Sequence, residues 1–236
     1  MKWIVAENYG ELSELAAEMV VGEMLTKQKR VNLAITAGTT PIGMYERLTT
    51  KVKGKNYLDH VHYYNFDEIP YKSGKQEGIT LSDLRRLYFS PAAIAEEQIE
   101  ILNEKNYQQH DAKIASDGGL DAIVLGIGTD GHYCGNLPGT TRFTDFTTEV
   151  PCDERLKKII VGHFEDPAEN PDSYVTLGPR SVMAAKHIIL LASGVKKSEA
   201  MQRFYHGEVT EAFPASILKM HPNITVIVDK AAGKLI

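Results

Sequence analysis

Short apolar segments of strand length alternate along this chain with longer segments whose apolar residues recur every three or four positions. The strand-like segments are residues 2–5, 31–37, 61–66, 122–125, 174–177, 188–192 and 224–228. The helix-like segments are residues 9–26, 44–50, 81–89, 107–116, 182–186, 198–205 and 215–220. We expect Ser90 and Pro91 to end the helix over 81–89. The alternation predicts an α/β fold with a doubly wound, mostly parallel sheet flanked by helices.

The chain length alone allows one or two domains. Its 236 residues contain no internal repeat and no low-complexity segment, so we expect a single domain over residues 1–236. Residues 140–171 follow no clear strand or helix pattern and are rich in Asp, Glu, Pro and Thr. Two interpretations of this segment stay open, a lid over a site and an ordinary irregular surface excursion.

Composition excludes several classes of function. With 43% apolar and 24% charged residues, the chain resembles an ordinary globular protein, and its formal net charge of -5 argues against nucleic-acid binding. No apolar run reaches the ~20 residues that a membrane span needs. Two cysteines, Cys134 and Cys152, are too few for a disulfide scaffold and fit a cytoplasmic protein. No spacing of His, Asp and Glu resembles a metal-ligand set.

The segment after residues 122–125 carries the strongest chemical signal. Gly126 and Gly128 break the strand, and Asp130 and His132 follow, separated by one residue. A glycine-rich turn at the carboxyl end of a parallel strand is where open α/β sheets bind ligands. A carboxylate beside an imidazole fixes the tautomer of the ring and raises its basicity, which suits proton transfer. The alternative is a plain turn with a surface Asp and a solvated His.

The strand over residues 31–37 ends in a loop suited to phosphate. Gly38, Thr39 and Thr40 are small or hydroxylated, and Pro41 fits the first turn of a following helix. Backbone N–H groups at a helix start attract anions. The loop lacks the lysine of a P-loop and the spacing of a dinucleotide fingerprint, so neither ATP nor NAD is expected. The alternative is an ordinary capped turn.

Two further strand ends carry charged residues. Asp67 and Glu68 follow residues 61–66 and could supply a general base, although a solvated strand end is the alternative. Lys197 follows residues 188–192 and could neutralise a phosphate, unless it is a solvated residue at a helix start. Because such strand ends lie at one edge of a doubly wound sheet, we expect these side chains to converge. We expect structural roles for Cys134 and His221.

Together, these segments resemble the glucosamine-6-phosphate deaminase/6-phosphogluconolactonase superfamily. The similar segments occur in the family's order, cover nearly the whole chain and are residues 37–43, 65–68, 126–132, 193–197 and 221–222. The resemblance implies a Rossmann-like fold, a sugar 6-phosphate ligand and no organic cofactor. It leaves a homo-oligomer open.

The residue roles follow from the amino-sugar branch, whose members turn glucosamine 6-phosphate into fructose 6-phosphate and ammonia. The resemblance implies Asp67 as the base that moves a proton between C2 and C1, and Asp130 with His132 as the pair that opens the sugar ring. The substrate-binding residues that it implies are Gly38, Thr39, Thr40, Gly128 and Lys197. The epimer at C4 is left open, so galactosamine 6-phosphate is an equal candidate.

Two positions depart from that branch. Leu137 stands where the branch has a Glu that supports the ring-opening histidine, and leucine cannot relay a proton. The branch's phosphate-binding Arg has no clear counterpart, with His163 and Arg180 both near its place. Residues 136–139 are partly similar to the lactonase branch. A 6-phosphogluconolactonase and a non-catalytic sugar-phosphate-binding module therefore stay open as alternatives.

Overall fold

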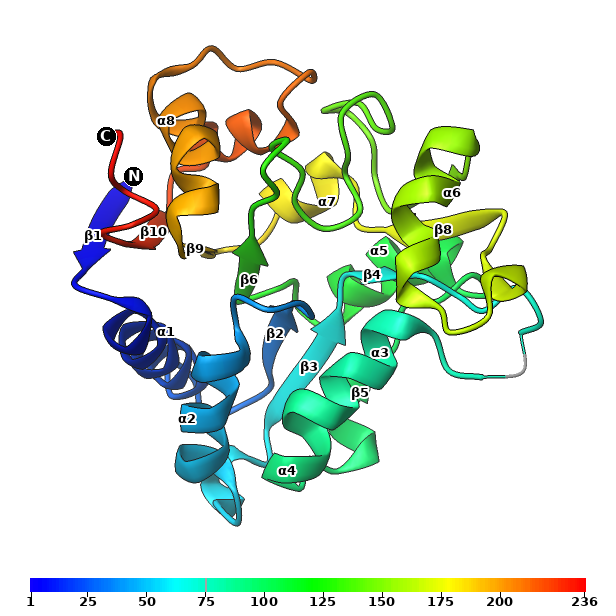
Figure 1. Cartoon of the computed structure of the whole chain (residues 1–236). Coiled ribbons are helices and arrows are strands. Elements are labelled where there is room, and N and C mark those ends of the chain that lie inside the picture. Colours follow the sequence, from blue (N-terminus) through cyan, green and yellow to red (C-terminus); the bar gives the residue numbers. More distant parts are fainter. Residues whose placement is uncertain (75) are drawn as a thin grey trace.

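A seven-stranded parallel sheet forms the centre of the computed structural model, which describes residues 1–74 and 76–236 (Figure 1). Its strands lie in the order β1-β10-β9-β6-β2-β3-β5. Their bounds are β1 Lys2–Ala6, β2 Val31–Ile35, β3 Val61–Asn65, β5 Ile99–Glu100, β6 Ala122–Gly126, β9 Ile188–Ala192 and β10 Ile224–Asp229. The predicted doubly wound α/β fold is confirmed, although the sequence pattern missed the two-residue edge strand β5.

Helices cover both faces of this sheet. The α-helices are α1 Tyr9–Met24, α2 Ile42–Val52, α3 Ile79–Leu84, α4 Ser90–Ala92, α5 Tyr107–Ser116, α6 Glu154–Ile160, α7 Pro179–Met183 and α8 Ser198–His206. Successive strand side chains point to opposite faces. Leu33 and Leu191 pack with α1 and α2, whereas Ala34 and Leu190 pack with α7 and α8. Both faces are therefore buried, which explains why the central strands are mostly apolar and do not alternate between apolar and polar residues.

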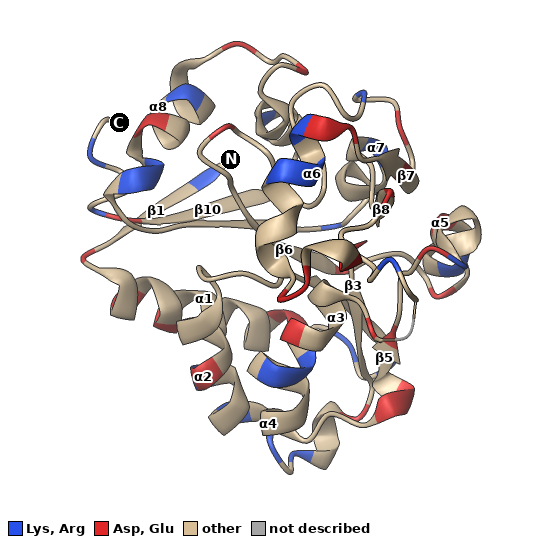
Figure 2. Ribbon diagram, turned by 45° about the vertical axis from the view of Figure 1, so that its right-hand side comes forward, with Lys and Arg blue, Asp and Glu red and all other residues tan. Residues whose placement is uncertain are grey.

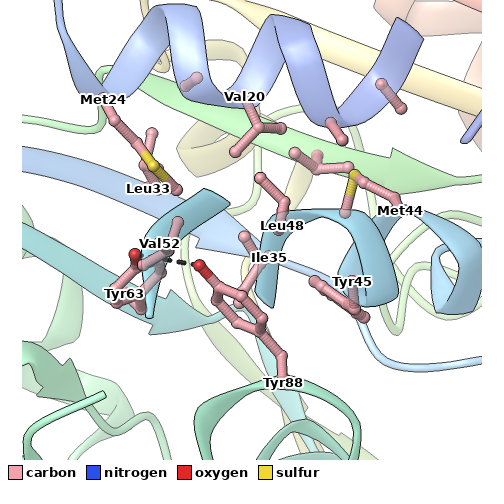
Figure 3. Packing of buried hydrophobic residues seen from close by; sticks show 14 of the residues in the cluster. Val20, Met24, Leu33, Ile35, Met44, Tyr45, Leu48, Val52, Tyr63 and Tyr88 are labelled. Atoms are coloured by element: carbon pink, nitrogen blue, oxygen red, sulfur yellow. Dashed lines mark hydrogen bonds between the residues drawn. The ribbon is translucent and has the colours of Figure 1, made fainter. Parts of the chain in front are cut away.

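The core under α1 and α2 contains the hydroxyl groups of three tyrosines as well as apolar side chains (Figure 3). The hydroxyls of Tyr63 and Tyr88 lie 3.2 Å apart, and the rings of Tyr45 and Tyr88 stack with centroids 5.1 Å apart. The Tyr45 hydroxyl donates a 2.5 Å hydrogen bond to the carbonyl of Thr36. Because a buried hydroxyl needs a partner, this bond ties the end of β2 to the core.

A second sheet of three antiparallel strands lies beside the carboxyl end of β3. Its order is β4-β8-β7, with β4 Asp67–Glu68, β7 Thr148–Pro151 and β8 Ser173–Thr176. The strand predicted over residues 174–177 therefore exists, but it pairs here and not in the parallel sheet. Residues 140–171 are more regular than expected, since they contain β7 and α6, which pack around an apolar cluster of their own.

The helix predicted over residues 81–89 continues past its expected stop. It runs through α3, a π-helical turn at Arg85–Phe89 and α4, so that Pro91 lies inside the last turn. A π turn widens the helix where a proline removes an N–H donor. The helix ends at Ala93, whose φ of 56° is left-handed. The predicted helix over 182–186 starts earlier, at Pro179, and the one over 215–220 is a 3-10 helix at Pro214–Met220.

Acidic and basic residues are interspersed along the ribbon in Figure 2. Helix α6, for example, begins with Glu154 and Arg155 and carries Lys157 and Lys158 in its last turn. Within residues 1–74 and 76–236, no helix is both long and apolar enough to cross a membrane.

Candidate active site

The predicted site segments follow four neighbouring strands and lie at one edge of the sheet. Strands β9, β6, β2 and β3 lie side by side, and the predicted site segments follow their carboxyl ends. The chain proceeds from β2 to β3 in one direction and from β6 to β9 in the other, so β2 and β6 border the switch point where such sheets bind ligands. A cavity of about 350 Å³ lies there.

Most of the predicted residues reach this cavity. It is lined by Gly38, Thr39, Thr40, Asp67, His132 and Lys197. Gly128 and Asp130 do not line it, but each contacts His132 directly. The fold therefore brings the predicted site residues together at this cavity. Six of them line it, and the other two touch His132, which lines it.

The Gly38–Thr40 loop presents free backbone donors. Gly38 has a φ of 95°, a left-handed conformation that favours glycine. Among the described residues, no protein acceptor takes the N–H groups of Gly38, Thr39 or Thr40. The Tyr9 hydroxyl donates to the carbonyl of Thr40 at 3.1 Å and fixes the loop at the start of α2. Free N–H groups at a helix N-terminus form an anion site.

Asp67 and Glu68 have different environments although they are adjacent. Asp67 faces the cavity, and burial raises the pKa of its carboxyl to about 6, opposed by a hydrogen bond from Thr80 and by the charge of His132. The Glu68 carboxylate is buried and accepts backbone N–H bonds from Ile69, Thr80 and Leu81 at 2.8–3.0 Å. Burial raises the pKa of Glu68 to about 8 against the effect of these bonds. Asp67 is thus available to a ligand, whereas Glu68 is occupied by the backbone.

Asp130 holds the imidazole of His132. Oδ1 of Asp130 lies 2.6 Å from Nδ1 of His132 and also accepts the backbone N–H of His132 at 3.1 Å. The hydrogen bond from His132 lowers the pKa of Asp130 to about 2. With Asp130 ionised, Nδ1 carries the shared proton and Nε2 is the nitrogen left for a ligand. A Cβ on Gly128 would lie 2.1 Å from Nδ1 of His132, so only glycine leaves room for this pair.

Lys197 is half-buried in a turn that a buried carboxylate holds. Burial lowers the pKa of its ammonium, and the charge of Asp130 opposes that effect. Ser193 and Gly194, at the start of this turn, donate hydrogen bonds of 2.5–3.1 Å to Asp229 at the end of β10. Gly194 has a φ of 87°, which requires glycine. Lys197 is therefore a cation placed by the backbone at the same cavity as the free N–H groups.

The region 140–171 forms one wall of the cavity. Ile159, Ile160 and His163 line it, and Ile159 is 52% exposed. The sequence left His163 and Arg180 as the two residues near the position of the amino-sugar branch's phosphate-binding arginine, and the structure places them differently. His163 lines the cavity, whereas the Arg180 guanidinium lies 4.3 Å from the centre of the Phe146 ring, outside the lining.

Among the cavity residues that were not predicted as site residues, Thr80, Tyr174 and Cys134 carry polar or titratable side chains. Thr80 donates a 3.0 Å hydrogen bond to Asp67, and Tyr174 lines the wall from β8. Cys134 lines the cavity with a left-handed φ of 46°, and burial raises the pKa of its thiol well above the usual range, so it is a thiol and not a nucleophilic thiolate. Only Thr80 had a sequence signal, since Gly78 just before it marks a close backbone approach to Glu68.

No group of His, Cys, Asp or Glu side chains within the described residues is arranged to hold a metal ion. His221 bonds to backbone on both sides, with Nε2 2.8 Å from the carbonyl of Ala185, in keeping with a structural role.

Comparisons with known proteins give a consistent picture. A family model described as glucosamine-6-phosphate isomerases/6-phosphogluconolactonase matches residues 10–227. A glucosamine-6-phosphate deaminase of Lysinibacillus sphaericus (strain C3-41) is 35% identical over 234 residues, which cover 96% of this chain and 98% of that protein. One from Clostridium acetobutylicum is 33% identical, with both chains covered completely.

Solved structures agree. A monomeric glucosamine-6-phosphate deaminase superposes with a TM-score of 0.86 at 28% identity, covering 100% of both chains. A 6-phosphogluconolactonase from Thermotoga maritima has a TM-score of 0.74 at 18% identity, covering 97% of this chain and 99% of that one, and so shares the fold.

Proposed function

Because the chain belongs to the glucosamine-6-phosphate isomerase/6-phosphogluconolactonase family, we propose that it is an enzyme that converts glucosamine 6-phosphate and water into fructose 6-phosphate and ammonia. One observation carries this proposal. Asp67 and His132, which Asp130 holds, line a single cavity that is also lined by the Gly38–Thr40 loop with its free N–H groups and by Lys197. In this proposal the phosphate of a sugar binds at the loop and Lys197, and the reacting carbons lie at Asp67 and His132.

The proposed phosphate site combines the N–H dipoles at a helix start with the positive charge of a lysine. The N–H groups of Gly38, Thr39 and Thr40 point from the start of α2, and Lys197 adds a positive charge from the turn after β9. Each contribution favours an anion, and their position at a sheet edge gives the phosphate a fixed place. His163 faces the same cavity from region 140–171 and is a further phosphate contact in this proposal.

Ring opening is assigned to the Asp130–His132 pair. The pyranose must open before the proton on C2 can move, because only the open form has a C1 aldehyde that makes this proton acidic. Nε2 of His132 takes the proton of the C1 hydroxyl and returns it to the ring oxygen as the C1–O5 bond breaks. Asp130 holds Nδ1 and stabilises the imidazolium that forms between these two steps.

Proton transfer between carbons is assigned to Asp67. Asp67 takes the C2 proton while the aldehyde oxygen on C1 gains a proton from the ammonium group that the substrate carries on C2, which gives an enolamine. Return of the Asp67 proton to C1 gives an iminium at C2. Water then adds to C2 and the C2–N bond breaks, which releases ammonia and leaves fructose 6-phosphate. A base with a pKa of about 6 is mostly ionised at neutral pH and still basic enough for this transfer.

Leu137 favours a second candidate, 6-phosphogluconolactone hydrolysis. This side chain lines the cavity and packs against the apolar cluster of region 140–171, so it cannot relay a proton. Within the described residues, Asp130 is then the only carboxylate bonded to His132. A lactonase needs just a general base on water, a role that His132 held by Asp130 satisfies.

The test follows ammonia and ketose phosphate release from glucosamine 6-phosphate and, separately, from galactosamine 6-phosphate. Release of both products from glucosamine 6-phosphate supports the deaminase, whereas release from the galactosamine sugar alone reassigns the epimer. If neither sugar reacts while 6-phosphogluconolactone decays faster than in buffer, the lactonase replaces the deaminase. Binding of these sugars without any turnover would make the chain a binding module.

We further propose that residues 140–171 act as a lid on a single-domain enzyme of the cytoplasm. Ile159 supports the lid, because an apolar side chain that is 52% exposed beside a ligand cavity gains burial when the wall moves inward. The free state of both cysteines fits a reducing compartment.

A further inference from the structure

Thr80 contacts the carboxyl group of the proposed base. Its hydroxyl donates a 3.0 Å hydrogen bond to Oδ1 of Asp67, and its side chain lines the same cavity. Thr80 is 5% exposed, so water does not compete freely for this hydroxyl. The bond leaves Oδ2 of Asp67 as the oxygen without a protein donor among the described residues.

The backbone around Thr80 is fixed by Glu68. The N–H groups of Thr80 and Leu81 both donate to the Glu68 carboxylate, at 2.8 and 3.0 Å. A Cβ on Gly78 would lie 2.3 Å from Oε1 of Glu68, so this turn approaches the carboxylate as closely as glycine allows. Glu68 therefore anchors the first turn of α3, and the anchored turn presents the Thr80 hydroxyl to Asp67.

Burial and polar neighbours have opposite effects on the pKa of Asp67. The titratable groups that face it are His132 and Cys134 after β6, Tyr174 in β8 and the adjacent Glu68. Burial raises the pKa of Asp67, and the Thr80 hydrogen bond and the charge of His132 lower it. A donor that bonds to a carboxylate stabilises the ionised form, which is the form that acts as a base.

From this geometry we propose that Thr80 is a positioning residue that orients Asp67, directs Oδ2 toward the substrate and keeps the base ionised. The role as a base rests on the function proposed above, whereas the effect of Thr80 on the Asp67 carboxyl does not.

Thr80→Val tests this, since valine keeps the shape of threonine and replaces only its hydroxyl with a methyl group. In the wild type, kcat/KM falls as pH drops through about 6, because protonated Asp67 cannot accept the C2 proton. In T80V the midpoint of this fall moves to higher pH by about one unit, because burial is no longer opposed by the hydrogen bond. Thr80→Ser keeps a hydroxyl and returns the midpoint toward the wild-type value.

Thr141→Val is the matched control. The Thr141 hydroxyl is also buried and donates 2.9 Å to Oδ1 of Asn136, but it does not touch Asp67. T141V keeps the wild-type midpoint even if it melts at a lower temperature. An unchanged midpoint in folded T80V, or an equal change in T141V, would overturn the proposal.

A titration that needs no turnover separates this inference from the proposed reaction. The 13C signal of the Asp67 carboxyl, assigned by its absence in Asp67→Asn, reports the ionisation directly in T80V and wild type. A higher titration midpoint in T80V supports the role of Thr80 even if the wild type releases no ammonia, and equal midpoints reject it. Ammonia release by wild type with equal midpoints would leave the proposed function standing and remove the inference alone.

Discussion

At the scale of single residues, the contrast between Asp67 and Glu68 explains how adjacent carboxylates differ in role. Three backbone N–H groups saturate Glu68, whereas one hydroxyl contacts Asp67 and leaves an oxygen toward the cavity. The sequence placed both side chains at the end of a strand but could not distinguish them. The difference arises from Thr80 and Leu81, which lie in a separate helix start.

Asp67→Asn removes the proposed base and little else. The amide has nearly the same size and its oxygen still accepts the Thr80 hydrogen bond, so the fold and the phosphate site remain. We expect kcat for ammonia release to fall by about a thousandfold, within the range for loss of a general base. Calorimetric binding of fructose 6-phosphate should stay within a few-fold of wild type. Full activity in D67N would remove Asp67 from the mechanism.

Gly128→Ala tests the room that the Asp130–His132 pair needs. The added Cβ would meet Nδ1 of His132 at 2.1 Å and Oδ1 of Asp130 at 2.6 Å, so the imidazole must move. A displacement near 1 Å costs about a hundredfold in rate, which we expect in kcat at a melting temperature close to wild type. Gly22→Ala in α1 is the control, because its Cβ meets nothing within 4 Å. Wild-type kcat in G128A would show that His132 needs no fixed position.

At the scale of elements, the sequence predicted strands where apolar runs end in glycine or charge. The runs at β6 and β9 are apolar because both of their faces are buried, and β2 and β3 are mostly buried as well. The polar residues that follow these strands lie at the cavity. The second sheet was not predictable in the same way. Its strands are short, β4 has two residues, and it is held by pairing between segments far apart in the chain.

Region 140–171 shows the same limit. Helix α6 has seven residues, and its Leu156 and Ile160 are buried only against β7, β8 and neighbouring loops. Asp153 caps its first turn, but a helix this short depends on such contacts for its stability, so the local pattern alone did not reveal it. His163 was accordingly one of two candidates for the phosphate until the fold placed it in the cavity and Arg180 outside.

His163→Arg is predicted to improve substrate binding. Arginine presents a planar fork that matches phosphate oxygens in a bidentate way, and its charge is permanent. We expect the KM for the sugar phosphate to fall several-fold in H163R and to rise in His163→Ala, each with kcat within a factor of about three. Arg180→Gln should change stability and leave KM alone. Equal KM values in all three variants would take His163 out of the phosphate site.

At the scale of the whole molecule, opposite ends of the strands carry buried aspartates with different duties. Asp121 precedes β6 and Asp229 ends β10, and each is 4% exposed. Asp121 accepts from Lys27, Lys186 and the N–H of Asn32 at the edge away from the cavity. Asp229 accepts from Ser193, Gly194 and the N–H of Ala232, and so joins the ends of β9 and β10 beside the cavity.

Asp229→Asn is therefore predicted to act on the substrate through Lys197. The amide nitrogen cannot accept the bonds that Ser193 and Gly194 donate, so the turn before Lys197 loosens and the unfolding free energy falls by about 1–3 kcal/mol. We expect the KM for the sugar phosphate to rise about tenfold, equivalent to about 1.4 kcal/mol of binding, with kcat changed much less. Steady-state kinetics and thermal unfolding measure both effects.

Asp121→Asn is the control for Asp229→Asn, because it tests whether a loss of stability alone raises KM. It removes an equally buried carboxylate and should lower the unfolding free energy by a similar ~1–3 kcal/mol. Its partners lie at the far edge of the sheet, so we expect KM to remain at the wild-type value. A KM that rises in D229N alone shows that the phosphate site depends on the link between β9 and β10. A KM that rises equally in both variants would mean that substrate binding follows overall stability, and Asp229 would then have no separate role in placing Lys197.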